Sequence, residues 1–316
     1  MDALVVMLKN VIVFVLLAVP GLLLVKTKLM GAEQSGVLSK LLLYIAMPFL
    51  IVSSTLGLSF NGELLKTSLI SAVIGIGYTF LWLLFTKWLT AKETEEKKRG
   101  MMRFCILFTN NGFLGIPLAT AVFLDKPLVI TCVIIINIIS NALMYTVGVY
   151  LISGDKSTVS AKKALANPIL IAFVIGLLLN VCKVKEFLPE VSTYTGYLGN
   201  MVTPLSMIIL GMKLGGVKFS SLFTKWETYY VSAFKLIVMP LLIVGITLLL
   251  DLWLGTGEEL VLGVFVAFGL PTAALSTTFA DHTGGDTENA VVYTLGSTVL
   301  SVATIPLLYG LISLFL

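Results

Sequence analysis

The sequence predicts an all-α membrane protein whose ten transmembrane helices form two inverted five-helix repeats. Three observations support this prediction: the composition, the number of long apolar segments, and matched interruptions in the two halves of the chain. Of the 316 residues, 58% are apolar and 12% are charged, and the mean hydropathy is +1.02. Soluble domains are about 25% charged, so this composition argues against a soluble enzyme, a disordered chain and a nucleic-acid-binding protein.

A helix that crosses a bilayer needs about 20 mainly apolar residues. The first candidate segment is longer than the apolar part of a signal peptide, begins near Asp2 instead of a basic residue, and ends without a small-residue cleavage site. We therefore expect it to remain as the first transmembrane helix. The ten predicted helices lie approximately at residues 3–25, 37–59, 67–90, 102–123, 127–153, 167–183, 193–215, 228–250, 259–280 and 288–315.

Lysine and arginine residues are concentrated on one side of this predicted topology. The loops after odd-numbered helices hold fifteen of them, and the loops after even-numbered helices hold four. Cytoplasmic loops are enriched in Lys and Arg, so the odd loops are predicted to be cytoplasmic and both termini extracytoplasmic. The net charge of +4 then reflects topology and requires no nucleic-acid partner. The fifteen include Lys156, Lys162, Lys163 and Lys213, and the charged run 92–103.

The two halves of the chain, residues 1–153 and 154–316, resemble each other. The second and seventh segments have a proline in the middle, Pro48 in YIAMPFLIVSSTLG and Pro204 in GNMVTPLSMIILGM. The fourth contains TNNGFLGIP, and the ninth contains FGLPTAALSTT. Five spans per half would make the two copies enter the membrane in opposite directions. Inverted repeats with interrupted helices are typical of secondary transporters, although channels and intramembrane enzymes can also be repeated.

Both interruptions combine helix-breaking residues with polar side chains. Gly and Pro weaken a helix, and an unpaired backbone group in lipid costs several kcal/mol. The broken segments are therefore expected to lie against protein or a wet cavity. The fourth segment has Asn110, Asn111, Gly112, Gly115 and Pro117 near its middle, and the ninth has Gly269, Pro271, Thr272, Ser276, Thr277 and Thr278.

Two antiparallel helices broken at the same depth are expected to cross in the middle of the membrane. Each would direct the N-terminus of a half-helix to the crossing, and each N-terminus carries about half a positive charge. Such a pair favours an anion, preferably a carboxylate, to which Asn110 and Asn111 could donate. The alternative is that the glycines and prolines only allow helices to pack, which explains one interruption better than two matched ones.

Lys235 lies in the eighth segment, roughly 9 Å from its cytoplasmic start. Charges inside a membrane are candidates for functional residues, so Lys235 either neutralises a substrate carboxylate or extends to the cytoplasmic surface along its own stem. Two polar stripes could line the site or form interhelical hydrogen bonds. They are Asn137, Asn141 and Tyr145 in the fifth segment, and Thr294, Ser297, Ser301 and Thr304 in the tenth.

Several other chemistries lack the residues that they require. The three cysteines, Cys105, Cys132 and Cys182, lie in apolar runs without CxxC spacing and are expected to be buried thiols. The GGD triplet has no second intramembrane carboxylate, so an aspartyl protease is rejected. His282, in FADHTGGDTE, either joins its acidic neighbours in a cation or pH sensor or lies in a polar loop capped by Asp286 or Thr287. No GxxxxGK[ST] motif is present, so a gradient or the membrane potential is the expected driving force.

The segments NNGFLGIPLA, AFGLPTAALSTTFA and STVLSVATIPLL resemble the bacterial members of the auxin efflux carrier family, which includes plant auxin exporters and bacterial permeases proposed for malate or malonate. The resemblance extends over essentially the whole chain. It implies the fold of bile-acid and sodium–proton exchangers, with helices 1, 2, 6 and 7 as a scaffold and helices 3–5 and 8–10 as a mobile transport domain. It also implies substrate binding where helices 4 and 9 cross, a functional basic residue before the eighth-helix proline, an elevator movement and a homodimer.

We therefore expect a secondary transporter, or a potential-driven uniporter, for a small organic anion such as a carboxylate or an auxin-like acid. It is expected in the plasma membrane (the inner membrane of a bacterium), with no cofactor; proton or sodium coupling stays open. The alternative is a membrane sensor that binds its ligand without moving it, and an enzyme is the weakest option. The expected substrate-binding residues are Asn110, Asn111, Gly112, Gly115, Pro117, Asn141, Lys235, Pro271, Thr272 and Ser276.

Overall fold

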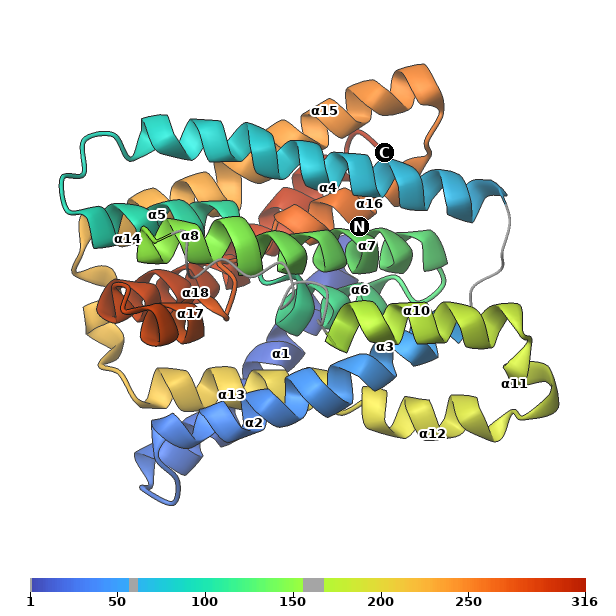
Figure 1. Cartoon of the computed structure of the whole chain (residues 1–316), viewed down its shortest axis with the longest axis horizontal. Coiled ribbons are helices and arrows are strands. Elements are labelled where there is room, and N and C mark those ends of the chain that lie inside the picture. The colour runs from blue at the N-terminus through green and yellow to red at the C-terminus, as the bar shows by residue number, and fades with distance from the viewer. Residues whose placement is uncertain (1, 57–61, 156–167) are drawn as a thin grey trace.

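The computed structural model describes residues 2–56, 62–155 and 168–316. Over these residues the named elements are all helical, as predicted, and the one extended pairing is an isolated antiparallel bridge between Thr109 and Thr272. The long helices run mostly along the longest dimension of the molecule (Figure 1). The predicted basic loop at Lys156, Lys162 and Lys163 lies outside the described residues.

Seven helical segments within the described residues are long and apolar enough to cross a bilayer. They correspond to the first, second, third, fifth, seventh, eighth and tenth predicted helices. Their bounds are Leu8–Lys26, Ala32–Leu56, Gly62–Leu89, Pro127–Ser153, Glu190–Gly215, Trp226–Leu254 and Thr287–Ile312. The other three predicted helices are shorter here, each for an identifiable reason.

The sixth predicted helix is the 14-residue α10 (Pro168–Val181), which adjoins residues outside the description. The fourth and ninth are interrupted. The fourth consists of α5 (Glu96–Leu107), a π-helical turn (Asn111–Gly115) and α6 (Ile116–Val122). The ninth consists of α16 (Glu258–Phe268) and α17 (Ser276–Thr283). The structure thus confirms both predicted interruptions.

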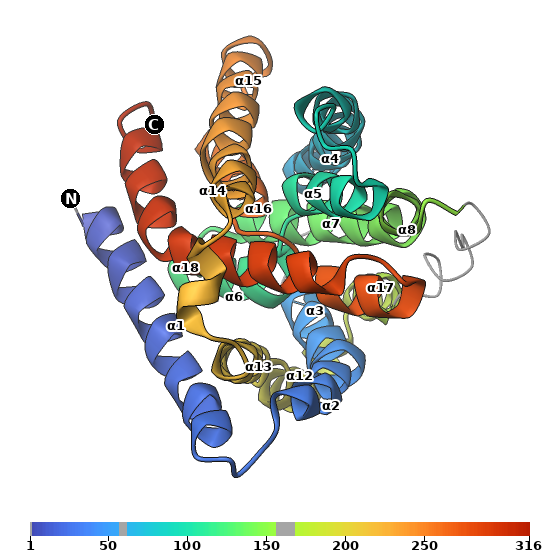
Figure 2. The same ribbon diagram turned by 90° about the vertical axis from the view of Figure 1, so that its left-hand side faces the viewer.

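The helices form two groups; in Figure 2 most helices of one group lie below the level of α18 and most of the other lie above it, while α1 runs past that level at the left. The first group packs α1 against α13 and α3 against α10 and α12; the second packs α7 against α4 and α16, α15 against α16, and α14 against α18. The first group comprises α1 (Asp2–Lys26), α2 (Ser35–Leu41), α3 (Met47–Leu56), α10, α11 (Val184–Phe187), α12 (Glu190–Gly199) and α13 (Val202–Gly215). The second comprises α4 (Gly62–Leu89), α5, α6, α7 (Pro127–Leu143), α8 (Val149–Ser153), α14 (Trp226–Ala233), α15 (Met239–Leu254), α16, α17 and α18 (Thr287–Ile312).

Small residues bring helices of the first group into close contact. A Cβ atom on Gly211 of α13 would lie 1.9 Å from the carbonyl oxygen of Ala18, and one on Gly21 of α1 would lie 2.0 Å from that of Ile208. No side chain fits at either position without moving the backbone opposite. Close approach through small residues is a usual source of packing energy between membrane helices, so α1 and α13 form a tight pair.

Three prolines distort the helices that contain them in the same way. A π-helical turn of five residues ends two positions before Pro48, Pro117 and Pro240 in each case. Proline lacks an N–H, and its ring clashes with the carbonyl four residues earlier, which accounts for a widened turn before each one. The turn before Pro240, Phe234–Val238, places Lys235 in a distorted part of its helix.

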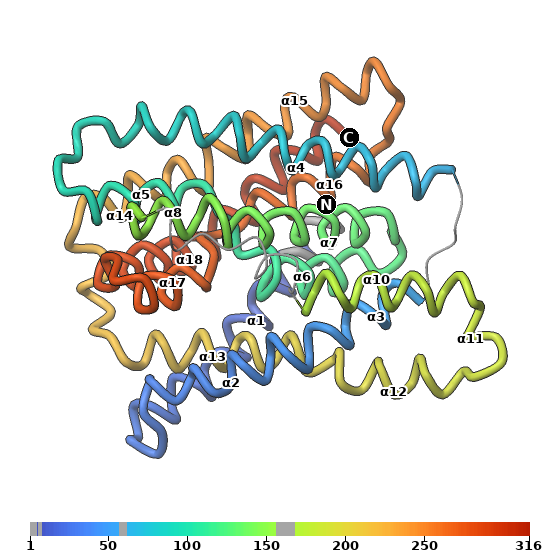
Figure 3. The backbone as a smooth tube through the Cα atoms, viewed as in Figure 1, coloured from blue at the N-terminus to red at the C-terminus, as the bar shows by residue number. Residues whose placement is uncertain are grey.

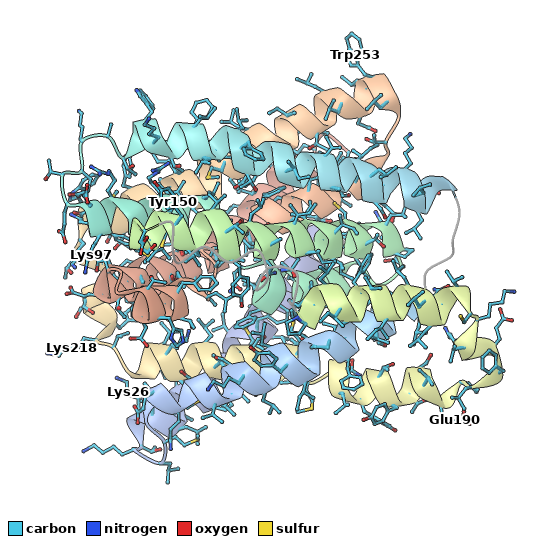
Figure 4. All side chains as sticks on the ribbon, in the orientation of Figure 1. Lys26, Lys97, Tyr150, Glu190, Lys218 and Trp253 are labelled. Atoms are coloured by element: carbon cyan, nitrogen blue, oxygen red, sulfur yellow. The ribbon has the colours of Figure 1, made fainter. Side chains whose placement is uncertain are left out.

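Basic residues mark one end of the molecule. Lys26, Lys97 and Lys218, all from loops predicted to be cytoplasmic, lie toward the left of Figure 4, and Glu190 lies at the opposite end. We call these the lysine end and the far end. The expectation of three buried thiols is wrong for Cys182, which is exposed just beyond the end of α10, whereas Cys105 and Cys132 are buried and free.

Candidate functional site

The two interrupted helices meet where their backbones unwind. Residues 108–110 and 271–273 run antiparallel: the Asn110 N–H donates to the Pro271 carbonyl at 2.9 Å, and the Ala273 N–H donates to the Phe108 carbonyl at 3.0 Å. Figure 3 shows α5 and α17 nearer the lysine end, with α6 and α16 nearer the middle and the far end. Because unpaired backbone groups are costly away from water, each interruption supplies the hydrogen bonds that the other lacks.

Side chains hold this crossing in place. Thr272 is fully buried; its hydroxyl donates to the Cys105 carbonyl in the last turn of α5 at 2.9 Å, and its N–H donates to the Ser297 hydroxyl of α18 at 3.3 Å. The Ser276 and Thr294 hydroxyls lie 2.6 Å apart, which links α17 to α18. These bonds attach the ninth-helix interruption to the two helices beside it.

Each half-helix that starts at the crossing keeps unpaired amide donors. The N–H groups of Gly112 and Phe113 have no acceptor among the described residues, and the same is true of Thr277 and Thr278. They are the second and third residues of the half-helices that begin at Asn111 and Ser276. Orphan donors at a helix N-terminus, with the dipole behind them, are a ready site for an anion.

Lys235 lies behind the crossing instead of in a cavity. Its side chain is fully buried, and its Nζ donates to the Thr109 hydroxyl. None of the ion pairs between described residues includes Lys235. The alternative that Lys235 reaches the cytoplasmic surface is therefore wrong, because the side chain turns to the unwound segment. From this position its amino group contacts the unwound segment through Thr109.

The two neighbouring asparagines have different surroundings. Asn110 lines two cavities beside the crossing, and its side-chain amide forms no hydrogen bond with the described residues. Asn111 is buried against α7, where its Nδ2 donates to the Ser140 hydroxyl at a long 3.4 Å and its Oδ1 has no hydrogen-bond partner among the described residues. The carboxamide of Asn110 is thus placed to reach a ligand, whereas that of Asn111 links the half-helix to α7.

Four hollows lined by described residues lie near the crossing. A cavity of about 270 Å³, which we call the crossing cavity, lies between α13, α18 and the two interruptions; its polar lining residues are Asn110, Ser206, Lys213, Thr277, Thr294 and Thr298. A hollow of about 20 Å³ beside it is lined by Gly112, Asn137 and Asn141. The lysine-end hollow, about 960 Å³, has Glu33, Lys40, Lys213, Asp281 and His282 in its wall, and the far-end hollow, about 540 Å³, has Ser53, Pro117, Thr131 and Asn200.

The predicted site residues separate into those that line a hollow and those that build the crossing. Asn110, Gly112 and Asn141 line the crossing cavity or the small hollow beside it, and Pro117 lines the far-end hollow. The others support the backbone or its contacts and line none of these hollows. They are Asn111, Gly115, Lys235, Pro271, Thr272 and Ser276.

Lys213 lines two of these hollows and is a candidate site residue that the sequence analysis did not identify. It was assigned to a cytoplasmic loop, but it lies in α13, where its Nζ donates to the Thr277 hydroxyl at 3.2 Å. The signal available in the sequence was its position inside the apolar run MIILGMKLGG. Phe113 was missed as well, and it lines three of the four hollows.

Part of the loop around His282 caps the N-terminus of α18. The Asp286 side chain accepts a hydrogen bond from the Asn289 N–H at 3.0 Å, so Asp286 is the N-cap of α18, as one of the two readings predicted. His282 and Asp281 line the lysine-end hollow. Of the described residues, none form a group of three or more His, Cys, Asp or Glu side chains placed to hold a metal ion.

Comparison with known proteins identifies relatives over almost the whole chain. The model of a family described as "Membrane transport protein" matches residues 5–309. A protein of Methanothermobacter thermautotrophicus described as an "Uncharacterized transporter" is 28% identical over 304 residues, which cover 94% of this chain and 95% of that protein.

Proposed function

The chain belongs to the membrane transport protein family, and we propose that it carries a small organic anion across the plasma membrane by alternating access. The observation that supports this most is the crossing of two interrupted helices with unpaired amide donors on both half-helices. Their helix dipoles add positive potential at the same place. A carboxylate is the anion that best matches this set of donors.

The access route is proposed to change from the lysine-end hollow to the far-end hollow. The crossing lies between them, so a movement of the second group along the first would expose it to one hollow and then to the other. By the positive-inside rule, the lysine end is the cytoplasmic end. The antiparallel pairing of the interruptions supports the proposed inverted relation of the two halves and ten crossings in all.

The polar contacts between described residues support a rigid second group. Ion pairs join Lys98 to Glu227 and Lys126 to Glu258 inside it, at 2.5 and 2.8 Å. None of the ion pairs links the two groups. Such an arrangement lets the second group slide without breaking charged contacts. An anion that leaves the cytoplasm with the inside-negative potential gains about 2.3 kcal/mol per 100 mV, so uniport without a coupled ion is the simplest form of this proposal.

Flux of labelled organic anions in proteoliposomes tests the proposal. Wild-type protein is expected to transport at least one of benzoate, indole-3-acetate, malonate or malate, and Asn110→Ala is expected to lose most of that flux. Asn111→Ala is expected to lose stability as well, because it removes a buried contact with α7. Gln34→Ala, which removes an exposed amide outside the hollows together with its local hydrogen bond from the Gly31 N–H, is the control.

Two results would contradict the proposal. One is wild-type protein that moves none of the four anions, and the other is Asn110→Ala with unchanged flux and affinity. Thermal stabilisation by an anion without any flux would favour the ligand sensor instead.

A further inference from the structure

Lys213 is the one side chain among the described residues that forms a hydrogen bond between the two helix groups. It belongs to the last turn of α13 in the first group, and its acceptor, Thr277, belongs to the first turn of α17 in the second. The other side-chain hydrogen bonds between described helices stay inside a group; Lys98 with Glu227 and Asn180 with the Thr55 carbonyl are examples. A polar contact at a sliding interface must break when the groups move.

The ammonium group of Lys213 is placed to meet an anion. It lines both the crossing cavity and the lysine-end hollow, so it lies where the two join. None of the ion pairs between described residues includes it. A part-buried ammonium whose acceptor is a neutral hydroxyl keeps donor capacity, since it has three N–H groups.

The crossing cavity suits one charged group attached to an apolar body. Its polar lining residues include Asn110, Lys213 and Thr277, and the Thr277 N–H has no acceptor among the described residues. The rest of its wall is mainly apolar. That wall includes Phe113, Leu114, Met207, Leu210, Val291 and Leu295. A second carboxylate would have to lie against these side chains, where an unpaired charge is strongly disfavoured.

We propose that Lys213 binds the anionic group of an amphipathic monoanion on the cytoplasmic side, and that it stays behind with the first group when the crossing moves. The anion replaces the Thr277 hydroxyl as the acceptor of the Lys213 ammonium. Its contact with the ammonium then breaks when the crossing moves toward the far end. None of the described residues that line the far-end hollow is charged, so the anion meets no replacement cation from them. Affinity is therefore high on the cytoplasmic side and lower on the far side. This inference rests on the proposed alternating-access function.

The test compares Lys213→Gln with wild type in vesicles of defined sidedness. Gln keeps a donor for Thr277 but removes the charge. Benzoate and indole-3-acetate are the monoanionic probes, and malonate is the dianion. Wild type is expected to prefer the monoanions. A hydrogen bond between charged groups contributes roughly a 10- to 100-fold change in binding, so Lys213→Gln is expected to raise the cytoplasmic half-saturation concentration by about that factor. The far-side value is expected to change by less than about threefold.

Three further variants separate charge from structure. Lys213→Arg keeps the charge and is expected to retain most of the affinity. Thr277→Val removes the hydroxyl, and because Lys213 then has no acceptor to give up, cytoplasmic affinity is expected to hold or improve. Lys218→Gln removes an exposed lysine just beyond α13 that lines none of the hollows, and is the matched control. Melting temperatures without ligand identify any variant that fails to fold.

The outcomes distinguish this inference from the proposed function. If wild type transports an anion but Lys213→Gln has unchanged cytoplasmic affinity, the inference is overturned and the proposed function stands. The same holds if Lys213→Gln weakens affinity equally on both sides, or if wild type prefers malonate to the monoanions. If Lys213→Gln does not fold, Lys213→Arg and Thr277→Val decide the test instead. Weak cytoplasmic binding of the monoanions in both variants would overturn the inference. Absence of flux in wild type for every anion contradicts the proposed function itself.

Discussion

The contact between Lys235 and Thr109 is the part of the crossing where a single residue has the largest electrostatic consequence. A fully buried ammonium donates to a hydroxyl of the unwound segment, and no ion pair between described residues neutralises it. A buried charge is costly unless its hydrogen bonds are made. The fold keeps a fully buried lysine against the unwound segment, and a role for its amino group there is part of the proposed function.

Thr109→Val is expected to destabilise the protein by about 1–3 kcal/mol or more, because it removes the acceptor of a buried ammonium. The melting temperature in detergent measures the loss. Thr79→Val is the matched control: Thr79 is also buried, but its hydroxyl bonds only to the Gly75 carbonyl of its own helix. Equal effects of the two substitutions would contradict a special contribution from the Lys235 contact.

Lys235→Met is expected to leave stability unchanged or to raise it, since replacing a buried charge with an apolar side chain of similar size is often neutral or stabilising. Transport is expected to fall at least about tenfold, because an anion at mid-membrane then lacks a compensating charge. Melting temperature and proteoliposome flux are measured on the same preparation. A Lys235→Met protein with reduced stability and normal flux would contradict both expectations.

At the scale of single residues, the sequence predicts which positions are unusual better than it predicts what they contact. Asn110 and Asn111 are adjacent and identical in type, yet one faces a cavity and the other faces α7. Hydrogen bonds to Pro271 and Ala273, far along the chain, set that orientation. Lys213 lies near a helix end, where lysine is common, and only the fold shows that α17 is opposite it.

Glycine allows close helix packing in both groups, and the second group has polar links in addition. In the first group α1 and α13 approach through Gly21 and Gly211; in the second, a Cβ atom on Gly100 of α5 would lie 2.0 Å from the Leu151 carbonyl oxygen of α8. Ion pairs and side-chain hydrogen bonds also tie helix ends of the second group together at both ends of the molecule. Lys66, for example, donates to the Leu254 and Gly255 carbonyls at the end of α15, at 2.9 and 3.0 Å. Each group thus has the internal connections of a rigid unit.

Gly211→Ala is expected to destabilise the protein by about 1–3 kcal/mol through overpacking, since the new methyl group would lie 1.9 Å from the Ala18 carbonyl oxygen. Gly245→Ala in α15 is the matched control: a Cβ atom on Gly245 would have no heavy atom of the described residues beyond its own helix turn within 4 Å. Alanine favours a helix over glycine by about 0.8–1 kcal/mol, so this control is expected to be neutral or stabilising. Denaturation in detergent compares the two, and similar losses would contradict tight packing of α1 on α13.

The loop before α5 is expected to make stability depend on pH. The hydrogen bond from Lys98, 2.9 Å from Glu93, lowers the pKa of the Glu93 carboxyl below its ordinary value of 4.5. A carboxyl whose pKa is lowered by folding stabilises the protein above its ordinary pKa, and this contribution disappears as the pH falls through the lowered value. Near pH 7 the melting temperature of wild type is expected to be higher than that of Glu93→Gln. This difference in melting temperature is expected to shrink at about pH 4 and below. A constant difference over this range would contradict the assignment.

The elements themselves were largely predictable from the sequence. Long apolar runs gave seven spanning helices near their predicted positions, and Gly and Pro together with Asn or Thr marked both interruptions. The π-helical turns before Pro48, Pro117 and Pro240 were not predicted. A proline signals a distortion, but whether the helix stops, kinks or widens depends on what packs against the freed carbonyls.

At the scale of the whole molecule, the crossing lies where the two groups meet, with a hollow toward each end. Hydrogen bonds and ion pairs are concentrated within the groups, and one side-chain hydrogen bond between described residues joins them. A site held by one rigid unit and facing another can change its access without being rebuilt. This arrangement connects the interrupted helices to the proposed transport of an anion.

The most direct measurement is an experimental structure of the protein with bound indole-3-acetate, or with benzoate if that anion is the better ligand. The account predicts density for the ligand in the crossing cavity, with its carboxylate within hydrogen-bond distance of Asn110, Lys213 or the first-turn N–H groups of α17. Density elsewhere, with residues 108–110 and 271–273 unchanged and the crossing cavity closed, would contradict it.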